Sequence, residues 1–373
     1  MKIAIPAETA VGEARVAASP DAVKNYIKKG VSVAVQAGAG LGSNFSDADF
    51  QAAGATIVKG DAIVKGADLV LTIRRPSAKL LAAMKSGAVV VGGLEPHGDL
   101  KALAAFAKSG VTAFALELMP RISRAQSMDV LSSQANLAGY KSVIDAAAQF
   151  GRAFPIMMTA AGTVAAAKVF IMGVGVAGLQ AIATARRLGA IVSATDVRKA
   201  TEEQVKSLGA KFIYVDLAEA ATAAGYAREL TDAEKAKQAE LVAGHIKTQD
   251  IVITTALIPG RPAPILVTQA MVESMKPGSV IIDLAVERGG NCPLSKPDKI
   301  VDHRGVKIIG TVNLAGKLAG NASPLFAKNI ANFLDLIIQR DGTLKIDDSD
   351  ECINGTMIAR AGKLVHKIYE AGK

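Results

Sequence analysis

The stretch AKVFIMGVGVAGLQAIATARRLGAIVSATD, residues 167–196, decides the fold of this 373-residue chain. Gly173, Gly175 and Gly178 form the pattern G-x-G-x-x-G, between an apolar run typical of a buried strand and an Ala-rich run typical of a helix. A second apolar run ends at Asp196, eighteen residues after Gly178. A glycine turn between a strand and a helix, followed by a strand that ends in an acidic residue, is the context in which this motif binds a dinucleotide.

The spacing assigns a separate role to each glycine. The first allows the tight turn, the second lets a pyrophosphate approach the backbone, and the third lets the helix pack on the strand. The phosphates are expected at the N-terminus of the helix, where free N–H groups and the helix dipole favour anions. A carboxylate at Asp196 accepts hydrogen bonds from ribose hydroxyls and repels a 2′-phosphate, which favours NAD over NADP, although Arg198 lies nearby. The predicted contacts with NAD(H) in this stretch are Gly173, Gly175, Val176, Gly178, Asp196, Val197 and Arg198.

Strand-like and helix-like segments alternate along most of the chain, which indicates an α/β protein with doubly wound parallel sheets. The sequence predicts two Rossmann-like domains joined by long helices. One is discontinuous, made of residues 1–132 and 324–373, and binds no nucleotide; the other, residues 133–323, binds NAD(H). A second long helix is expected with Ser323 as its cap and Pro324 in its first position. The residues after it are expected to return to the first domain as a short polar tail.

The composition limits the class of protein. The net charge is +9, but the basic residues are scattered and only 4% of the residues are aromatic, so a solvated surface is favoured and no nucleic-acid site is expected. An anionic membrane surface or an acidic partner remains the alternative explanation of the charge. Cys292 and Cys352 fit no metal-binding or CxxC spacing, which is typical of a reduced, intracellular protein. The apolar runs are shorter than the roughly 20 residues of a membrane helix, so the chain alone is expected to be soluble.

An acid–base group for catalysis is hard to find in the sequence. Of the four histidines, His245, His303 and His366 are expected at the surface, and only His97, after a predicted strand, is a candidate. Asp283 and Glu287, near the end of a later strand, are candidate polar contacts or structural residues.

Two further segments are candidates for ligand contact. The Ala-rich, charged segment 216–240 carries its one aromatic, Tyr226, beside Gly225, as a flexible cover or an ordinary exposed helix would. The segment PRISRAQSMDVLSSQ, residues 120–134, is rich in arginine, glutamine and serine and keeps no clear helical or strand period.

Several segments together resemble one known family. They are ELMPRISRAQSMDVLSSQANLAGY, MTAAGT, GVGVAGLQAIATARRLGA, ITTALIPGRPAP, MKPGSVIIDLAVERGGNCPLS and ASPLFAKNIANFL. The chain closely resembles the NAD(H)-binding alpha subunit of proton-translocating nicotinamide nucleotide transhydrogenases, from its first residues to about residue 340.

The resemblance implies roles for the unexplained segments. Residues 120–134 would be a loop that reaches the nicotinamide, with Arg121, Gln126 and Asp129 as its polar triad and Ser132 just beyond. Arg121 paired with Asp129 would hold that loop rigid, although Asp129 and the serines are equally suited to capping helices. Tyr226 would belong to a mobile loop that closes over NAD(H). The loop TTALIPG, residues 254–260, would place Ala256 and Leu257 beside the cofactor.

The resemblance also implies an activity and partners. NADH bound here would pass its hydride directly to NADP⁺ on a beta subunit, as a Si/Re-specific transhydrogenase active only with its partners. A membrane-spanning subunit would carry the proton, and this chain would be a homodimer in the cytoplasm, peripheral to the inner face of the cell membrane.

Two alternatives remain open. Alanine dehydrogenase resembles the same family, but Arg74 and Gly93 stand where its pattern has catalytic Lys and His, although Arg15 is kept. A non-catalytic NAD-binding module would keep the glycine turn and need no triad near the nicotinamide.

Overall fold

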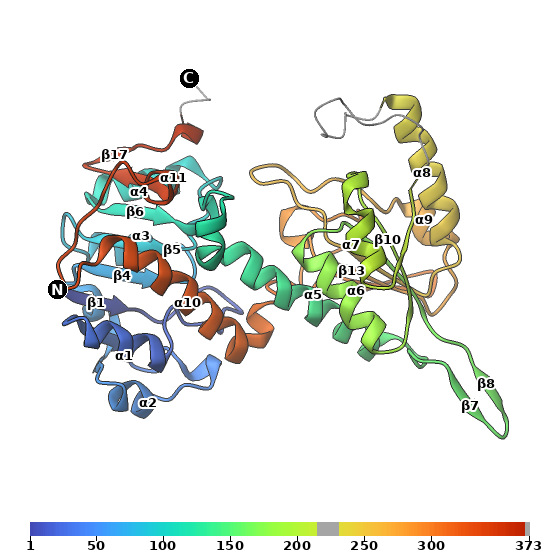
Figure 1. The fold of residues 1–373 in the computed structure, drawn as a ribbon, viewed down its shortest axis with the longest axis horizontal. Helices are drawn as coiled ribbons and strands as arrows, with labels where there is room; N and C mark the ends of the chain where they lie inside the picture. Colours follow the sequence, from blue (N-terminus) through green and yellow to red (C-terminus); the bar gives the residue numbers. More distant parts are fainter. Residues whose placement is uncertain (215–230, 370–373) are drawn as a thin grey trace. The chain divides into compact units, whose positions relative to one another are not determined.

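A largely parallel sheet forms the centre of each of two units in the computed structural model, which describes residues 1–214 and 231–369. The discontinuous unit comprises Met1–Gln134 with Ala315–Lys373, and the continuous unit comprises Ala135–Leu314. Helices pack on both sheets (Figure 1). This arrangement confirms the predicted fold class.

The sheet of the discontinuous unit has the order β17-β16-β6-β5-β4-β1-β2-β3. Its strands are β1 (Lys2–Ile5), β2 (Ser32–Gln36), β3 (Thr56–Val58), β4 (Leu69–Thr72), β5 (Val89–Gly92), β6 (Thr112–Ala115), β16 (Met357–Arg360) and β17 (Lys363–Leu364). The first six are parallel, and β16 pairs antiparallel with β6. The C-terminal segment therefore returns to this sheet as predicted, but it adds two strands that the sequence did not indicate.

The helices of this unit flank its sheet. They are α1 (Pro20–Lys28), α2 (Asp47–Ala52), α3 (Ala78–Ala82), α4 (Leu100–Ser109), α10 (Ala319–Ile337) and α11 (Glu351–Thr356). The α1 helix begins as predicted, because the Ser19 side chain accepts a hydrogen bond from the Ala22 N–H and Pro20 needs no donor in the first turn.

The predicted start of α10 is wrong. The helix begins at Ala319, with Pro324 inside it, and Ser323 does not cap it. The Ser323 hydroxyl instead accepts a hydrogen bond from the Val16 N–H at 3.0 Å and bonds the Ser43 hydroxyl at 2.7 Å. Proline is tolerated because it lies near the N-terminus of the helix, where few backbone N–H groups have helical partners.

The sheet of the continuous unit has the order β11-β10-β9-β12-β13-β15-β14. Its strands are β9 (Lys168–Met172), β10 (Ile191–Thr195), β11 (Lys211–Phe212), β12 (Ile251–Thr254), β13 (Val280–Asp283), β14 (Ile300–His303) and β15 (Val306–Ile309), and its helices are α6 (Val176–Arg187), α7 (Glu202–Ser207), α8 (Asp232–Ile246) and α9 (Gln269–Ser274). Of these strands, β14 alone runs antiparallel to its neighbour. Helix α5 (Val130–Gln149) crosses the unit boundary and begins inside the polar stretch 120–134, earlier than the sequence suggested.

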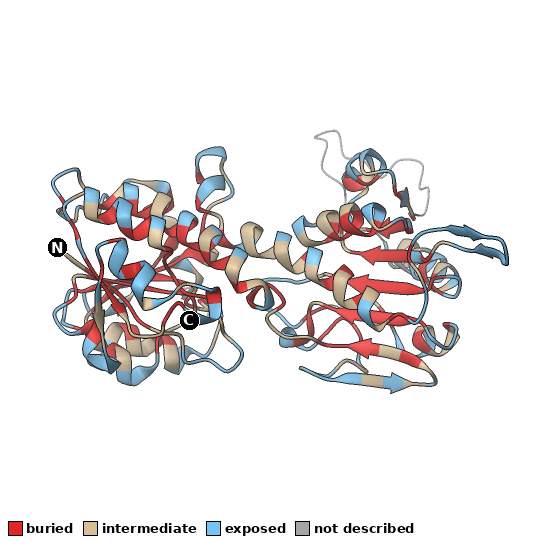
Figure 2. Cartoon of the chain, turned by 90° about the horizontal axis from the view of Figure 1, so that it is seen from below, coloured by how far each residue is buried: buried red, intermediate tan, exposed pale blue. Residues whose placement is uncertain are grey.

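Buried residues line both faces of the central strands, which appear red in Figure 2. Strands β4, β5, β6, β12 and β13 are buried at every position, as expected for parallel strands covered on both sides. Each unit has core clusters of its own. No helix in the described ranges is long and apolar enough to cross a membrane.

A two-stranded hairpin in the continuous unit was not predicted. Strands β7 (Met157–Thr159) and β8 (Gly162–Val164) pair antiparallel and are exposed at every position (Figure 2). Met158 is 85% exposed, and the segment 156–167 contains no charged residue. An uncharged hairpin with this exposure is unusual for a surface that faces only water.

Candidate functional site

The glycine turn lies between β9 and α6, and its three glycines meet different surroundings. Gly173 has φ +104°, and a Cβ there would lie 2.5 Å from the Thr255 hydroxyl oxygen. A Cβ on Gly178 would lie 1.9 Å from the Gly173 carbonyl oxygen, whereas a Cβ on Gly175 would meet nothing within 4 Å. Gly173 and Gly178 are therefore required by the turn and by packing, and Gly175 leaves open space at the start of α6.

The N-terminus of α6 is open to an anion. Gly175 occupies the cap position, and no side chain caps the helix. The first backbone N–H groups of a helix lack helical partners and carry the positive end of its dipole. The open space at Gly175 and these N–H groups fit a pyrophosphate.

Asp196 follows β10 and lies beside the glycine turn. One of its oxygens accepts a hydrogen bond from the Val174 N–H at 2.7 Å, and the Arg198 guanidinium contacts both oxygens at 2.9 and 3.1 Å. Burial alone would raise the pKa of Asp196, but the hydrogen bonds from Arg198 and Val174 hold it below its ordinary value. The carboxylate is thus ionised and covered by Arg198, whose side chain is 57% exposed. A ribose would have to displace this guanidinium.

Apolar predicted residues stand at the same edge of the sheet. Val176 begins α6, Val197 follows β10 and Leu257 follows β12, and these elements flank β9. Their side chains are exposed by 39%, 75% and 52%. The carboxyl ends of adjacent parallel strands form the edge at which ligands bind in doubly wound sheets.

Sequence analysis missed Asn291 and misjudged Asp283. Asn291 is fully buried, and its side chain bonds the Ala256 N–H at 3.1 Å, the Ala256 carbonyl at 2.9 Å and the Pro264 carbonyl at 2.8 Å. Asp283 is also fully buried and accepts hydrogen bonds from the N–H groups of Ala285, Asn291 and Cys292. Asp283 is therefore no ligand contact; it folds the loop that lets Asn291 fix the backbone of Ala256. A buried Asn beside paired glycines was the only signal in the sequence.

The polar stretch in the discontinuous unit is a firmly anchored loop. Residues Ser123–Met128 form a 3₁₀ helix whose Ala125 and Met128 are buried. The Ser127 carbonyl accepts hydrogen bonds from the side-chain amides of Asn329 and Asn332 on α10, both at 2.8 Å. These contacts hold the backbone of the loop against α10.

The predicted triad of this loop is only partly brought together. Arg121 and Gln126 are exposed, and across residues 1–214 and 231–369 their side chains form no hydrogen bond or ion pair. Asp129 does not pair with Arg121, so that prediction is wrong: its carboxylate accepts hydrogen bonds from the Ser132 N–H at 2.9 Å and the Ser132 hydroxyl at 2.5 Å. Capping the start of α5 satisfies the carboxylate locally.

The histidines differ from the prediction. His97 is exposed, whereas His366 is buried and bonds the Gly355 carbonyl. His245 is no surface residue either: it bonds the Ser193 hydroxyl at 2.8 Å and packs on Phe170. Burial lowers the pKa of His245 and of His366. Tyr226 lies outside the described residues.

Comparison with known proteins agrees with this geometry. Family models described as the alanine dehydrogenase/PNT N-terminal and C-terminal domains match residues 4–138 and 142–367. The chain is 55% identical to the first of the polypeptides that form NAD(P) transhydrogenase subunit alpha in Rhodospirillum rubrum, over 98% of each chain. It is 33% identical to alanine dehydrogenase of Mycobacterium tuberculosis, over 80% of this chain and 76% of that one.

Solved structures give the same result. A transhydrogenase from Sinorhizobium meliloti has a TM-score of 0.91 and 53% identity, over 98% of this chain and 100% of that one. An L-alanine dehydrogenase with a TM-score of 0.83 and 24% identity, over 100% of this chain and 98% of that one, shares the fold. The chain therefore belongs to the alanine dehydrogenase/PNT family and, within it, is similar along nearly its whole length to alpha subunits of NAD(P) transhydrogenase.

Proposed function

We propose that this chain is the NAD(H)-binding component of a proton-translocating transhydrogenase. The observation that carries the proposal is the open position at Gly175, at an uncapped helix N-terminus beside the ionised Asp196. A pyrophosphate on this helix and a ribose on Asp196 would fix the adenosine half of the dinucleotide. Val176, Val197, Ala256 and Leu257 would line the site, and Arg198 would swing away from the carboxylate.

The nicotinamide would be oriented by the anchored loop. A carboxamide needs both donors and acceptors, which the unpartnered side chains of Arg121 and Gln126 supply. Asp129 and Ser132 would act by fixing the backbone at the start of α5. The bound cofactor supplies the hydride, so the residues of this chain need only hold the ring at the correct angle and distance. The lack of a histidine at the glycine turn agrees with such a role.

Oxidation of an amino acid is the second candidate, and two contacts count against it. A Cβ on Gly93 would lie 2.4 Å from the Ile73 carbonyl oxygen, so a histidine at that position would require the backbone to shift. Arg74, where the alanine dehydrogenase pattern has a lysine, bonds Glu13 at 2.9 Å. This edge of the discontinuous unit is therefore committed to internal ion pairs.

The proposal includes the partners of the chain. The acceptor NADP⁺ would be held by a beta subunit, and a membrane-spanning subunit would couple transfer to proton movement and hold this chain at the inner face of the cell membrane. Coupling of this kind requires that the partners distinguish between conformations of the complex. The exposed, uncharged hairpin β7–β8 suits the interface of a homodimer.

The test is reconstitution with an NADP(H)-binding partner subunit. Wild type should transfer hydride from NADH to an NADP analogue, and alanine with NAD⁺ should give no NADH. Arg121→Ala should lower transfer about 100-fold while changing the Kd for NADH by less than about threefold, because it alters orientation more than binding. Arg124→Ala, in the same loop but paired with Asp350 at 2.9 Å, is the matched control and should change transfer little.

The failures are distinct. Binding of NADH without transfer would identify a non-catalytic module, and rapid alanine oxidation would identify the rival enzyme. Equal losses of transfer and of affinity in Arg121→Ala would reduce Arg121 to a binding residue.

A further inference from the structure

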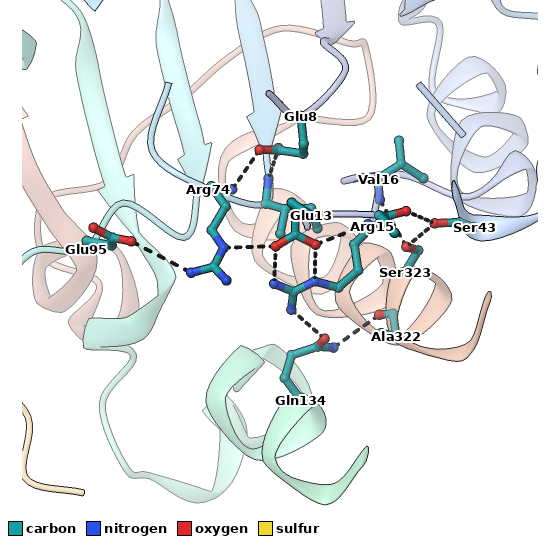
Figure 3. A network of polar contacts seen from close by, with 12 residues as sticks. Glu8, Glu13, Arg15, Val16, Ser43, Arg74, Glu95, Gln134, Ala322 and Ser323 are labelled. Carbon is teal, nitrogen blue, oxygen red and sulfur yellow. Dashed lines mark hydrogen bonds and ion pairs between the residues drawn. The ribbon is translucent and has the colours of Figure 1, made fainter. Parts of the chain in front are cut away.

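A buried ion cluster in the discontinuous unit lies where a ligand would be expected in a doubly wound sheet. Strands β1 and β4 are parallel neighbours at the point where the strand order reverses. The loop after β1 carries Glu8, Glu13 and Arg15, and the loop after β4 carries Arg74 (Figure 3). The side chains of Glu13 and Arg15 are only 1% and 8% exposed. Protein groups, rather than a ligand, thus satisfy these charges.

Glu13 fixes the Arg15 guanidinium in one orientation. The Arg15 Nε and Nη2 atoms each donate to a different oxygen of Glu13 at 2.7 Å, and Arg74 Nε donates to the same carboxylate at 2.9 Å. Burial by itself would raise the pKa of Glu13, but the bonds and charge of Arg15 and the bond from Arg74 lower it to about 2. The carboxylate therefore stays ionised at any physiological pH, and the two-bond geometry restricts Arg15 to one plane.

The remaining nitrogen of Arg15 reaches the helix that follows the nicotinamide loop. Arg15 Nη1 donates to Gln134 Oε1 at 2.8 Å, and Gln134 Nε2 donates to the Ala322 carbonyl at 3.1 Å. Figure 3 shows Gln134 held between these two groups. Gln134 is one helical turn after Val130, the first residue of α5, so the fixed amide sets the position of the helix start.

We propose that Arg15, held by Glu13, is a positioning residue for the loop that carries Arg121, Gln126 and Asp129, and that it acts through Gln134. The inference rests on the proposed function, because it assigns the loop to hydride transfer. Arg121 and Gln126 make no side-chain contact of their own among the described residues. Their placement is therefore set by the backbone, and the backbone depends on its anchors.

A second anchor shares this load. The Ser133 hydroxyl donates to Asn329 Oδ1 at 2.7 Å, and Asn329 also holds the Ser127 carbonyl. Loss of the Gln134 link should therefore shift the start of α5 without releasing the loop. A partial loss of transfer is expected rather than its abolition.

The test replaces the link and leaves the buried charges in place. Gln134→Met removes both hydrogen bonds at similar volume, whereas Gln134→Glu keeps an acceptor for Arg15. Gln149→Met, at the other end of α5, is the matched control. With the reconstituted complex, Gln134→Met should lower kcat about tenfold and leave the KM and Kd for NADH within about twofold. Gln134→Glu should restore most of the kcat, and Gln149→Met should behave as wild type.

Amide hydrogen exchange of the chain alone gives a readout that needs no partner. Amides of residues 121–129 should exchange faster in Gln134→Met than in wild type, and at the wild-type rate in Gln134→Glu. Wild-type kcat and wild-type exchange in Gln134→Met would overturn the proposal. If wild type itself transfers no hydride, the proposed function fails, and the exchange result alone decides whether Arg15 and Gln134 position the loop. Arg15→Lys, which keeps the charge but loses the two-bond geometry, should reproduce the Gln134→Met result.

Discussion

At the scale of single residues, Glu8 is the group whose charge depends most on folding near neutral pH. Burial raises its pKa to about 7, and the nearby Glu13 carboxylate acts in the same direction, against the N–H groups of Ile73 and Arg74. The folded chain therefore binds a proton on Glu8 more tightly than the unfolded chain, in which the pKa of this carboxyl has its ordinary value of 4.5. The stability from this proton is full below pH 4.5 and is lost as pH rises through about 7.

Replacing Glu8 by Gln should remove this dependence. We expect the free energy of unfolding of Glu8→Gln, relative to wild type, to rise by about 2 kcal/mol between about pH 5 and about pH 8, because the variant never buries a charge there. Urea unfolding at the two pH values measures the change. Glu203→Gln, at an exposed position, controls for the loss of one carboxylate. A difference between wild type and Glu8→Gln that stays constant with pH would contradict the prediction.

Residue roles could be predicted where the cause is local in sequence. The glycine turn follows from three positions and their flanking pattern, and the structure gives each glycine its own steric reason. The roles of Arg15 and Asn291 could not be predicted, since their partners lie 119 and 35 residues away. Asp129 shows the ambiguity: the same carboxylate suits an ion pair or a helix cap, and only the structure shows the bond to Ser132.

At the scale of elements, the hairpin β7–β8 makes a prediction about assembly. Met158 is 85% exposed, and burying it in a symmetric dimer would contribute about 2 kcal/mol from each copy. Met158→Asp should therefore weaken self-association by roughly 100-fold or more, measured by sedimentation as a function of concentration. Met158→Leu, which stays apolar, should assemble as wild type does. A dimer of unchanged strength in Met158→Asp would place the interface elsewhere.

Elements buried on both sides were the easiest to predict. The parallel strands read as continuous apolar runs, and most begin and end within a residue or two of the expected positions. The edge strands β14, β16 and β17 and the hairpin were missed, because short strands with exposed positions carry no such run. The start of α10 was misplaced because a Ser-Pro pair is also compatible with the interior of the first turns.

At the scale of the whole molecule, the two units have separate cores, so a ligand that binds one unit stabilises mainly that unit. The proposed function requires more than this. The adenosine half would contact the glycine turn of the continuous unit, whereas the nicotinamide would contact the loop at residues 121–129 of the discontinuous unit. Ligands that differ only in the nicotinamide can therefore separate the two contacts.

Hydrogen exchange with NADH and with ADP-ribose tests this division. Both ligands should slow exchange of the amides at residues 173–179, because both carry the pyrophosphate that would bind the start of α6. Only NADH should slow exchange at residues 121–129, because ADP-ribose has no nicotinamide for Arg121 and Gln126 to hold. At a ligand concentration of 100 Kd the gain is about 2.7 kcal/mol for amides that exchange only through opening of the ligand-binding unit, a slowing of roughly 100-fold. Equal protection of the loop by both ligands would mean that Arg121 and Gln126 do not contact the nicotinamide, and protection of the glycine turn by neither would remove the dinucleotide site itself.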